Sequence, residues 1–477
     1  MRISSALKTA LAVTASALTL AACADVPKLG PKAVEASASS YATTQSFAAP
    51  TSEWASDRWW DVYGDAQLSK LVDEALANSP TLAQARARLE SADAQVMMSN
   101  AARLPTLSAN AQFDETEVSH AQGFPPQFSA FFPRGYNPNG RATLDGGYDL
   151  DLFGKNRAAL ASSVSERAAA RADVAQARLT LSTAVAQAYG DLARLAAERA
   201  AAAESVKNRT ESGQLTAQRV KNGLDTRAEL NQANAATPSS QADVEALDEQ
   251  ILIARHRIAA LLGEGPDRGL DITLPGPEQV KAFGLPADLT VNLIGRRPDI
   301  VAAKLRAEAA AKRIDVAKAA FMPDINLAGF IGFQAFPIGQ LFSNGNVGQI
   351  GPAISLPLFE GGKLKAGYRN ARGDYDAAVD AYNQTVVAAL QDVADSAASV
   401  QSAQRQLAER REALKAGEAA YSIAELRYKG GLSSYVAVLS AEDAVITERR
   451  AFADAQARVF TLDIALTRAL GGGFVAS

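Results

Sequence analysis

VKNGLDTRAEL, at residues 220–230, returns as YKGGLSSYVAV at residues 428–438. Each copy places a lysine and a Gly-Leu pair between a long segment without proline and a second helical run. Glycine is favoured just past the end of a helix because it readily adopts the left-handed backbone that stops the helix. The chain is therefore expected to build the end of the same helical hairpin twice.

The repeat extends far beyond these two ends. Residues 155–263 match residues 363–471 at a constant offset of 208 residues, and DLDLFGKNR at 149–157 corresponds to SLPLFEGGKLK at 355–365. A third match aligns Pro80 with Pro298 in the preceding helical segments. Matches in one order indicate an internal duplication. The predicted parts are a first repeat at 59–263, a Gly- and Pro-rich linker at 264–286, a second repeat at 287–471 and a tail at 472–477.

The composition excludes several classes of protein. The chain has 477 residues, of which 48% are hydrophobic and 6% aromatic, and its formal net charge is −4. This mild charge, without a basic block, argues against nucleic acid as a partner. One cysteine and two histidines argue against disulfide frameworks, Cys-rich metal sites and His-dependent catalysis. No catalytic constellation is visible, so we expect neither an enzyme nor a metal site.

The N-terminus is typical of a secreted lipoprotein. Residues 1–22 combine a positively charged start with a short apolar run, as in a signal peptide. They end in Leu-Ala-Ala before Cys23, and this resembles a bacterial lipoprotein box in which Cys23 would be diacylated, carry palmitate and begin the mature chain. The alternative is an AxA-type cleavage site that leaves Cys23 a free thiol. We expect a covalent lipid on Cys23, no other cofactor, and a lipid-anchored extension over 23–58.

Each repeat is predicted to contain a helix, two strands, a very long helix and a return helix. A heptad seam over the second long helix, from Val379 to Tyr428, favours supercoiling. Pro238, in a TPSS segment, is expected to cap, kink or restart the first return helix. The predicted strands are 105–115, 141–153, 323–335 and 347–359, and the predicted long and return helices are 156–221, 225–262, 364–429 and 433–470.

The predicted strands have one apolar and one polar face. In TLDGGYDLDLF, at 143–153, Leu144, Tyr148, Leu150 and Leu152 alternate with Asp145, Asp149 and Asp151. Such segments of about ten residues are typical of a membrane β-barrel wall, although a soluble sandwich with one wet face remains the alternative. Four strands are fewer than the roughly eight of the smallest barrels, and an open sheet edge is not tolerated in lipid. Three copies of the chain would close a twelve-stranded barrel.

Several motifs resemble the TolC-like outer-membrane efflux factors, specifically the lipidated NodT/OprM-type branch that serves resistance-nodulation-division (RND) pumps. They are WWDVYGDAQLSKLVDEALANSP at 59–80, PLFEGGK at 357–363, YKGGLSSYVAVLSA at 428–441 and the terminal ALGGGF. The resemblance implies a mainly α-helical homotrimer with a twelve-stranded barrel in the outer membrane, continuous with a periplasmic helical barrel. It also implies a passive exit duct for small molecules such as drugs, in contact with outer-membrane lipid, a periplasmic adaptor (membrane fusion) protein and an inner-membrane RND-type transporter.

The resemblance assigns roles to the two hairpin ends. In such proteins these ends dock the adaptor, although helix capping alone would also explain their glycines. The matching residues are Lys221, Asn222, Gly223, Leu224, Asp225, Lys429, Gly430, Gly431, Leu432 and Ser433.

The resemblance also implies a gate at this level. Relatives carry selective aspartates where this chain has the neutral Ala437 and Ser440, and Asp443 could partly replace them. Our hypothesis for closure is a contact between Tyr428 and Glu229, with Lys429 or Arg227. The alternative makes Tyr428 the last seam residue and Glu229 a solvated charge.

Two other functions compete with efflux. An outer-membrane duct for type I protein secretion would share the fold, and a lipid-anchored coiled-coil spacer of the envelope would conduct nothing. Alternating strands in both repeats argue against the spacer. No Met-rich or His-rich lining indicates a copper or silver substrate, so drugs, detergents or other small amphiphiles are expected.

Overall fold

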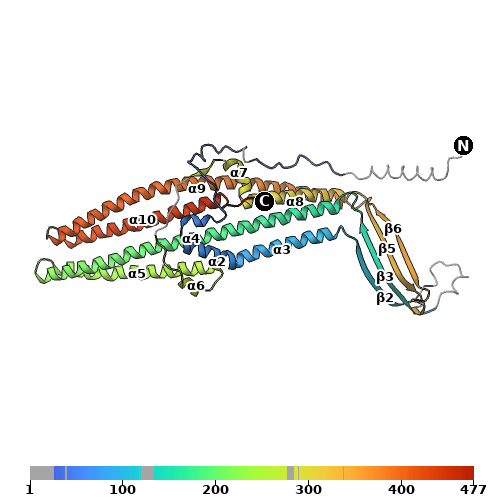
Figure 1. Ribbon diagram of the computed structural model, residues 1–477, viewed down its shortest axis with the longest axis horizontal. Coiled ribbons are helices and arrows are strands. Elements are labelled where there is room, and N and C mark those ends of the chain that lie inside the picture. Colours follow the sequence, from blue (N-terminus) through green and yellow to red (C-terminus); the bar gives the residue numbers. More distant parts are fainter. Residues whose placement is uncertain are drawn as a thin grey trace. The chain divides into compact units, whose positions relative to one another are not determined.

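The computed structural model describes residues 26–37, 40–117, 119, 134–276, 284–287, 289–336 and 338–476 (Figure 1). The predicted signal peptide and the predicted lipid on Cys23 lie outside the described residues.

The chain forms two compact units, and each takes segments from both predicted repeats. Unit 1 comprises Met1–Val34, Glu90–Ala168 and Lys304–Asp380. Unit 2 comprises Glu35–Leu89, Ala169–Ala303 and Ala381–Ser477. The duplicated sequence segments are therefore not separate compact bodies.

Helices dominate the structure (Figure 1). The two long helices have 67 residues each and begin one residue earlier than predicted. The return helices begin two residues later than predicted, after Thr226, which caps the first return helix through its side chain, and after Ser434, which makes no such bond to the second. In the described part of the chain, no helix is both long and apolar enough to cross a membrane. The helices of at least eight residues are α2 (Ala66–Asn78), α3 (Pro80–Ala101), α4 (Lys155–Lys221), α5 (Arg227–Leu262), α7 (Leu289–Arg296), α8 (Pro298–Ala319), α9 (Lys363–Lys429) and α10 (Tyr435–Ala469). The shorter ones are η2 (Trp59–Tyr63), α6 (Asp267–Leu270) and η4 (Ile338–Gln340).

Helix α5 continues through Pro238, so of the three outcomes predicted for this residue, a cap, a kink or a restart, the cap and the restart are wrong. Proline removes one backbone hydrogen bond from a helix interior. The buried residues Ala233, Ser240 and Leu247 lie on both sides of it in the same helix. The packing of this face over 36 residues outweighs the local cost.

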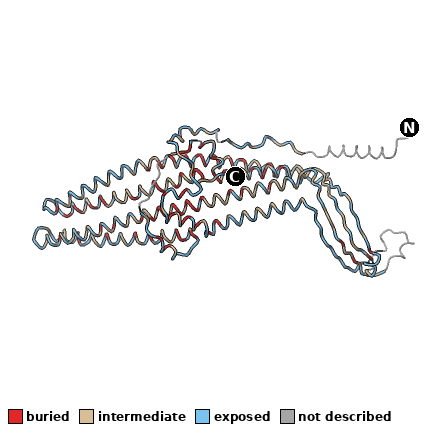
Figure 2. Tube along the Cα trace, viewed as in Figure 1, coloured by how far each residue is buried: buried red, intermediate tan, exposed pale blue. Residues whose placement is uncertain are grey.

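The heptad seam of α9 is buried from Val379 to Val400 and at Tyr428, and it is partly buried at Leu407, Leu414 and Tyr421 between them. Val386, Val393, Val400 and Tyr428 are each at most 1% exposed. Figure 2 shows buried positions alternating with exposed ones along the helices. Regular burial every seven residues is the pattern by which long helices pack side by side.

Unit 1 contains an antiparallel sheet in the order β2 (Thr106–Thr116), β3 (Asn137–Asp149), β5 (Asp324–Ala335) and β6 (Asn346–Ser355). A parallel pair of two-residue strands, β1 (Thr51–Ser52) and β4 (Leu285–Pro286), lies in unit 2. The sheet register places Ala109, Leu144 and Ile331 side by side on one face. Along each strand, neighbouring side chains alternate between the two faces.

The apolar face of the sheet is exposed. Leu107, Ile331 and Ile350 lie on it and are 75%, 66% and 79% exposed. On the opposite face Asn110 and Thr143 both donate hydrogen bonds to Asp145, at 2.9 and 2.8 Å. Leucine and isoleucine side chains on such a broad exposed surface indicate contact with an apolar environment.

Two strands end earlier than predicted, β3 at Asp149 instead of residue 153 and β6 at Ser355 instead of residue 359. Asp151 has a positive φ of 45°, and its carboxylate accepts hydrogen bonds from the backbone N–H groups of Asn156 and Arg157. It therefore satisfies the start of α4 instead of extending the polar face of a strand. Periodicity alone cannot separate these two uses of an aspartate.

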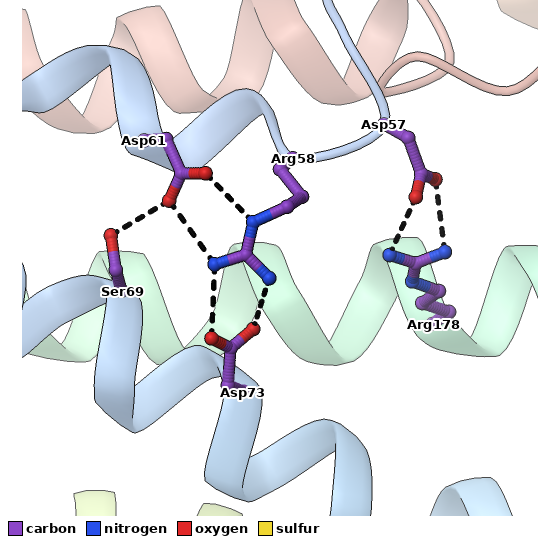
Figure 3. A network of polar contacts seen from close by, with 6 residues as sticks. All are labelled: Asp57, Arg58, Asp61, Ser69, Asp73 and Arg178. Atoms are coloured by element: carbon purple, nitrogen blue, oxygen red, sulfur yellow. Dashed lines mark hydrogen bonds and ion pairs between the residues drawn. The ribbon is translucent and has the colours of Figure 1, made fainter.

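An aromatic cluster in unit 2 holds residues 57–63 against the neighbouring helices. Trp59, Trp60 and Tyr63 are buried, and the ring centroids of Tyr63 and Phe460 lie 4.8 Å apart. Arg58 pairs with Asp61 and Asp73, while Asp57 pairs with Arg178 from α4 (Figure 3). Because these ion pairs are exposed, the aromatic burial supplies most of the stability.

In unit 1 the N-terminal segment lies against α8 and α9. The backbone N–H of Ala33 donates to Asp376 at 3.0 Å, and Arg372 donates to the carbonyl of Pro31. Val26 and Leu29 pack against a cluster that contains Phe321 and Tyr368.

Candidate functional site

Both hairpins of unit 2 end in the same backbone motif. Gly223 after α4 has a φ of 74°, and Gly431 after α9 has a φ of 75°. The N–H of Leu224 donates to the carbonyl of Arg219 at 2.9 Å, and the N–H of Leu432 donates to the carbonyl of Arg427 at 2.8 Å. These bonds, five residues back along the chain, define a Schellman cap. The repeated sequence thus produces two matching hairpin ends.

The residues predicted to dock an adaptor are exposed, apart from Asp225 and Ser433. Leu224 and Leu432 are 64% and 72% exposed. A leucine in this position of a Schellman cap often packs back on its own helix. Here both leucines present apolar surface to the surroundings.

Tyr428 joins the two hairpins. It is 1% exposed, and its hydroxyl donates to Asp225 Oδ2 at 2.6 Å. The Tyr428 hydroxyl oxygen also lies 2.8 Å from the hydroxyl of Thr216, a buried residue of α4. The contact therefore joins the end of α9 to α4 and the turn that follows it.

Arg219 completes this cluster. Its Nε lies 2.9 Å from Asp225 Oδ2, and its guanidinium carbon lies 4.8 Å from the ring centroid of Tyr428. Burial opposes the charge of Asp225, but hydrogen bonds from Arg219 and Tyr428 hold its pKa below the ordinary value. Burial, followed by the bond to Asp225, raises the pKa of Tyr428 to about 12. We call Tyr428, Asp225, Arg219 and Thr216 the tyrosine latch.

The predicted contact between Tyr428 and Glu229 is wrong in this structure. Glu229 forms a capping box with Thr226 at the start of α5, and its carboxylate accepts the backbone N–H of Thr226 at 2.7 Å. Lys429 pairs with Glu425 at 2.7 Å. The Thr-x-x-Glu spacing is the usual signal of a capping box and could have identified this role. No comparable local signal links Asp225 to Tyr428, which lies 203 residues away.

The three positions of α10 that were considered for a charged gate carry only one charge, and that charge is paired. Ala437 and Ser440 are exposed and neutral. Asp443 is also exposed, but it accepts a hydrogen bond from Arg209 at 2.6 Å. Arg209 lies 3.2 Å from Glu442 as well, and neither Arg209 nor Glu442 was identified from the sequence.

Hydrogen bonds of Tyr428 and ion pairs of Arg209 form polar contacts between the two hairpins. In the described part of the chain, no group of three or more His, Cys, Asp or Glu residues could hold a metal ion. Breaking the tyrosine latch would expose a carboxylate, a guanidinium and a phenol to water, which can solvate all three. The contact between the two hairpins could therefore break and form again without leaving a charged group away from water.

The family model described as outer membrane efflux protein matches residues 71–264 and 289–472. The fusaric acid resistance protein FusA of Burkholderia cepacia is 33% identical over 366 residues, or 75% of this chain and 68% of the relative. The multidrug resistance outer membrane protein MdtP of Escherichia coli K12 is 29% identical over 433 residues, or 89% and 88% of the two chains.

Solved structures share the fold. The outer membrane protein VceC of Vibrio cholerae has a TM-score of 0.81 and 41% identity, and the match covers 88% of this chain and all of VceC. The outer-membrane channel OprN has a TM-score of 0.82 and 30% identity, and the match covers 94% of this chain and 99% of OprN.

Proposed function

Since the chain belongs to the outer membrane efflux protein family, it acts in efflux at the outer membrane, and we propose that it is the exit duct of a tripartite pump. The predicted family, fold class and outer-membrane location are confirmed by the family match and by the solved relatives. Relatives named for multidrug and fusaric acid resistance favour small organic molecules as substrates over secreted proteins.

The observation that carries this proposal is the four-stranded sheet with an exposed apolar face. Its outer strands, β2 and β6, have no further partner among the described residues. Backbone groups at such edges must be paired inside a membrane. Three copies joined edge to edge would close a barrel of twelve strands and leave none unpaired. A homotrimer would therefore pair the backbone groups of both sheet edges. The polar face of the sheet would then line the water-filled path.

The exposed hairpin ends support the proposal of a protein partner in the periplasm. The exposed Leu224 and Leu432, together with the neighbouring lysines, offer a repeated surface for a periplasmic adaptor. The adaptor would connect the duct to an inner-membrane RND-type transporter, which supplies the energy. A lipid on Cys23 would add a second attachment to the outer membrane, with two acyl chains giving a stable anchor.

The tyrosine latch is proposed as the closing contact. Two hydrogen bonds of the buried Tyr428 phenol hold the two hairpins of one chain together, and an ion pair within the first hairpin joins Arg219 to Asp225. Opening would separate Tyr428 from Asp225. The neutral Ala437 and Ser440 would then leave the mouth without a strong preference for cations.

Single-channel recording of the purified full-length protein in planar bilayers tests the duct. We expect discrete conductance steps from a preparation whose mass corresponds to three chains. A folded trimer that produces no discrete steps would contradict the proposal and favour a non-conducting spacer. A drug-sensitive strain that lacks its own duct supplies a second test, because the intact protein should restore growth in the drug if the pump partners are present.

A further inference from the structure

A second polar cluster joins the two hairpins, and it is separate from the tyrosine latch. Glu442 from α10 is only 5% exposed, and its two carboxylate oxygens lie 3.2 Å from Arg209 Nε and 3.4 Å from the hydroxyl of Ser205. Both partners belong to α4. We call Glu442, Arg209, Ser205 and Asp443 the Glu442 cluster.

The cluster contains two carboxylates and one guanidinium. Arg209 makes its shortest contact with Asp443, at 2.6 Å, and a longer one with the deeply buried Glu442. Asp443 is two-thirds exposed, whereas Glu442 has little access to water. An ionised carboxylate that is buried without full compensation is costly, and a proton removes that cost. Glu442 is therefore the member of the cluster best placed to bind a proton.

The surroundings of Glu442 supply no second cation in direct contact among the described residues. The charged and titratable groups that face it are Arg209 from α4, Tyr421 from α9, and Tyr435 and Asp443 from α10. Helix α5 contributes the carbonyl of Ala236, which accepts from Arg209 at 3.3 Å. A polar groove of about 420 Å³, lined in part by Ser205, Arg209 and Asp443, lies beside the cluster and gives solvent a route to it.

The internal duplication shows that the repeated fold does not require this cluster. At the offset of 208 residues, Arg209 corresponds to Gly417 and Ser205 to Ala413. Glu442 corresponds to Asn234, and Asp443 corresponds to Ala235. The first hairpin thus carries Arg209 without the two carboxylates, and the second carries both carboxylates without the arginine, so neither hairpin needs the complete cluster to form. The charges serve a purpose beyond forming the hairpin.

We propose that Glu442 takes up a proton when the two hairpins close against each other and releases it when they part, so that acid conditions hold the duct closed. This rests on the proposed gating role of the hairpin ends. Glu442 would act as a positioning residue, since it sets how tightly α10 packs on α4.

The direction of the pH effect follows from burial. Burial raises the pKa of Glu442 above the ordinary value of 4.5, and the charge of Arg209 only partly opposes this. A carboxyl with a raised pKa in the closed state stabilises that state most at low pH, and the effect is lost as pH rises through the raised pKa. If Glu442 returns to an ordinary pKa on opening, a difference of one unit between the states changes their ratio by up to about tenfold.

The test records open probability of the full-length protein at several values between about pH 5 and about pH 8, a range in which an ordinary carboxylate stays ionised. Wild type should open more often as pH rises. Glu442→Gln keeps the shape and cannot ionise, so its profile should be flat and its open probability low. Glu204→Gln is the matched control, because Glu204 also joins the hairpins through Arg449 but is exposed. It should retain the wild-type slope.

A measurement that does not need conduction separates this inference from the proposed duct. The unfolding temperature of the detergent-solubilised protein should fall with rising pH more steeply in wild type than in Glu442→Gln. Arg209→Gln removes the compensating charge and should move the pH dependence toward higher pH. Equal pH slopes in wild type and Glu442→Gln would overturn the inference even if the protein conducts, and so would opening favoured by acid through Glu442. Absent conductance with the expected unfolding slopes would overturn the duct alone.

Discussion

Tyr428 holds two hairpins together through a single hydroxyl group. Its partner Asp225 is ionised and is itself held by Arg219, so the hydrogen bond is assisted by charge. Bonds of this kind contribute about 1.5–3 kcal/mol, roughly twice as much as neutral ones. A contact of this size can keep a channel closed and can still be broken by a docking partner.

Replacing Tyr428 by phenylalanine removes the hydroxyl and preserves the ring. We expect the closed state to lose about 1.5–3 kcal/mol and the open probability in planar bilayers to rise at least about tenfold. Glu229→Gln is the control, because it affects a capping box and not the latch. Equal open probabilities for Tyr428→Phe and wild type would argue that the latch does not close the duct.

Gly471 is a second residue whose replacement should strongly affect the stability of the fold. Its φ is 91°, and an added Cβ would lie 1.9 Å from the carbonyl oxygen of Arg296. We expect Gly471→Ala to destabilise the protein by more than about 1–3 kcal/mol, because both the backbone and the contact are strained. Thermal unfolding measures this. Gly367→Ala should leave stability unchanged or slightly raise it, because Gly367 lies inside α9 with open space beside it. Similar melting for the two variants would refute the close approach.

At the scale of elements, the long helices and the strands were largely predictable, but the ends of the strands β3 and β6 were not. The proline-free segments and the heptad seam predicted α4 and α9 to within one residue at their starts. Alternation predicted both faces of the sheet, and the register confirms them. Asp149 is the last residue of β3, as predicted, whereas Asp151 was assigned to the same strand because it continues the period, yet its carboxylate binds the start of α4. The alternation of a strand can be recognised from several neighbouring residues, whereas a helix cap depends on the backbone conformation of a single residue, which the sequence pattern does not show.

The exposed face of the sheet should tolerate no charge. Ile331→Arg places a guanidinium among apolar side chains, and such changes cost about 2–4 kcal/mol near the middle of a membrane. We expect fewer trimers in the outer-membrane fraction. Gln349→Arg places the same side chain on the opposite face, next to Phe330 in the register, and should be tolerated. Normal membrane levels of Ile331→Arg would show that this face does not contact lipid.

At the scale of the whole molecule, a closed ring of three chains would concentrate whatever charge each chain contributes to the mouth. Ala437 and Ser440 contribute none, and the charge of Asp443 is shared with Arg209. Charges near one another in a narrow aqueous path act strongly on passing ions, and their effect is screened over about 10 Å at 0.1 M salt. The mouth of this duct is thus expected to discriminate weakly between cations and anions.

Ser440→Asp would supply the missing charge three times in a trimer. We expect the reversal potential in a salt gradient to shift toward the cation value, with a larger shift at low ionic strength because screening is weaker there. Ser440→Asn has a similar size without the charge and should behave like wild type. An unchanged reversal potential in Ser440→Asp would place position 440 away from the conducting path.

The amino-acid sequence by itself determined the duplication, the long helices, the two faces of each strand and the positions of both hairpin ends, because each of these is a pattern among neighbouring residues. Only the tertiary structure decided that Tyr428 binds Asp225 and not Glu229, and that Arg209 serves Glu442 and Asp443 together. Those partners lie more than 200 residues apart. Which side chains meet depends on how two separately formed hairpins pack, and no local pattern records that choice.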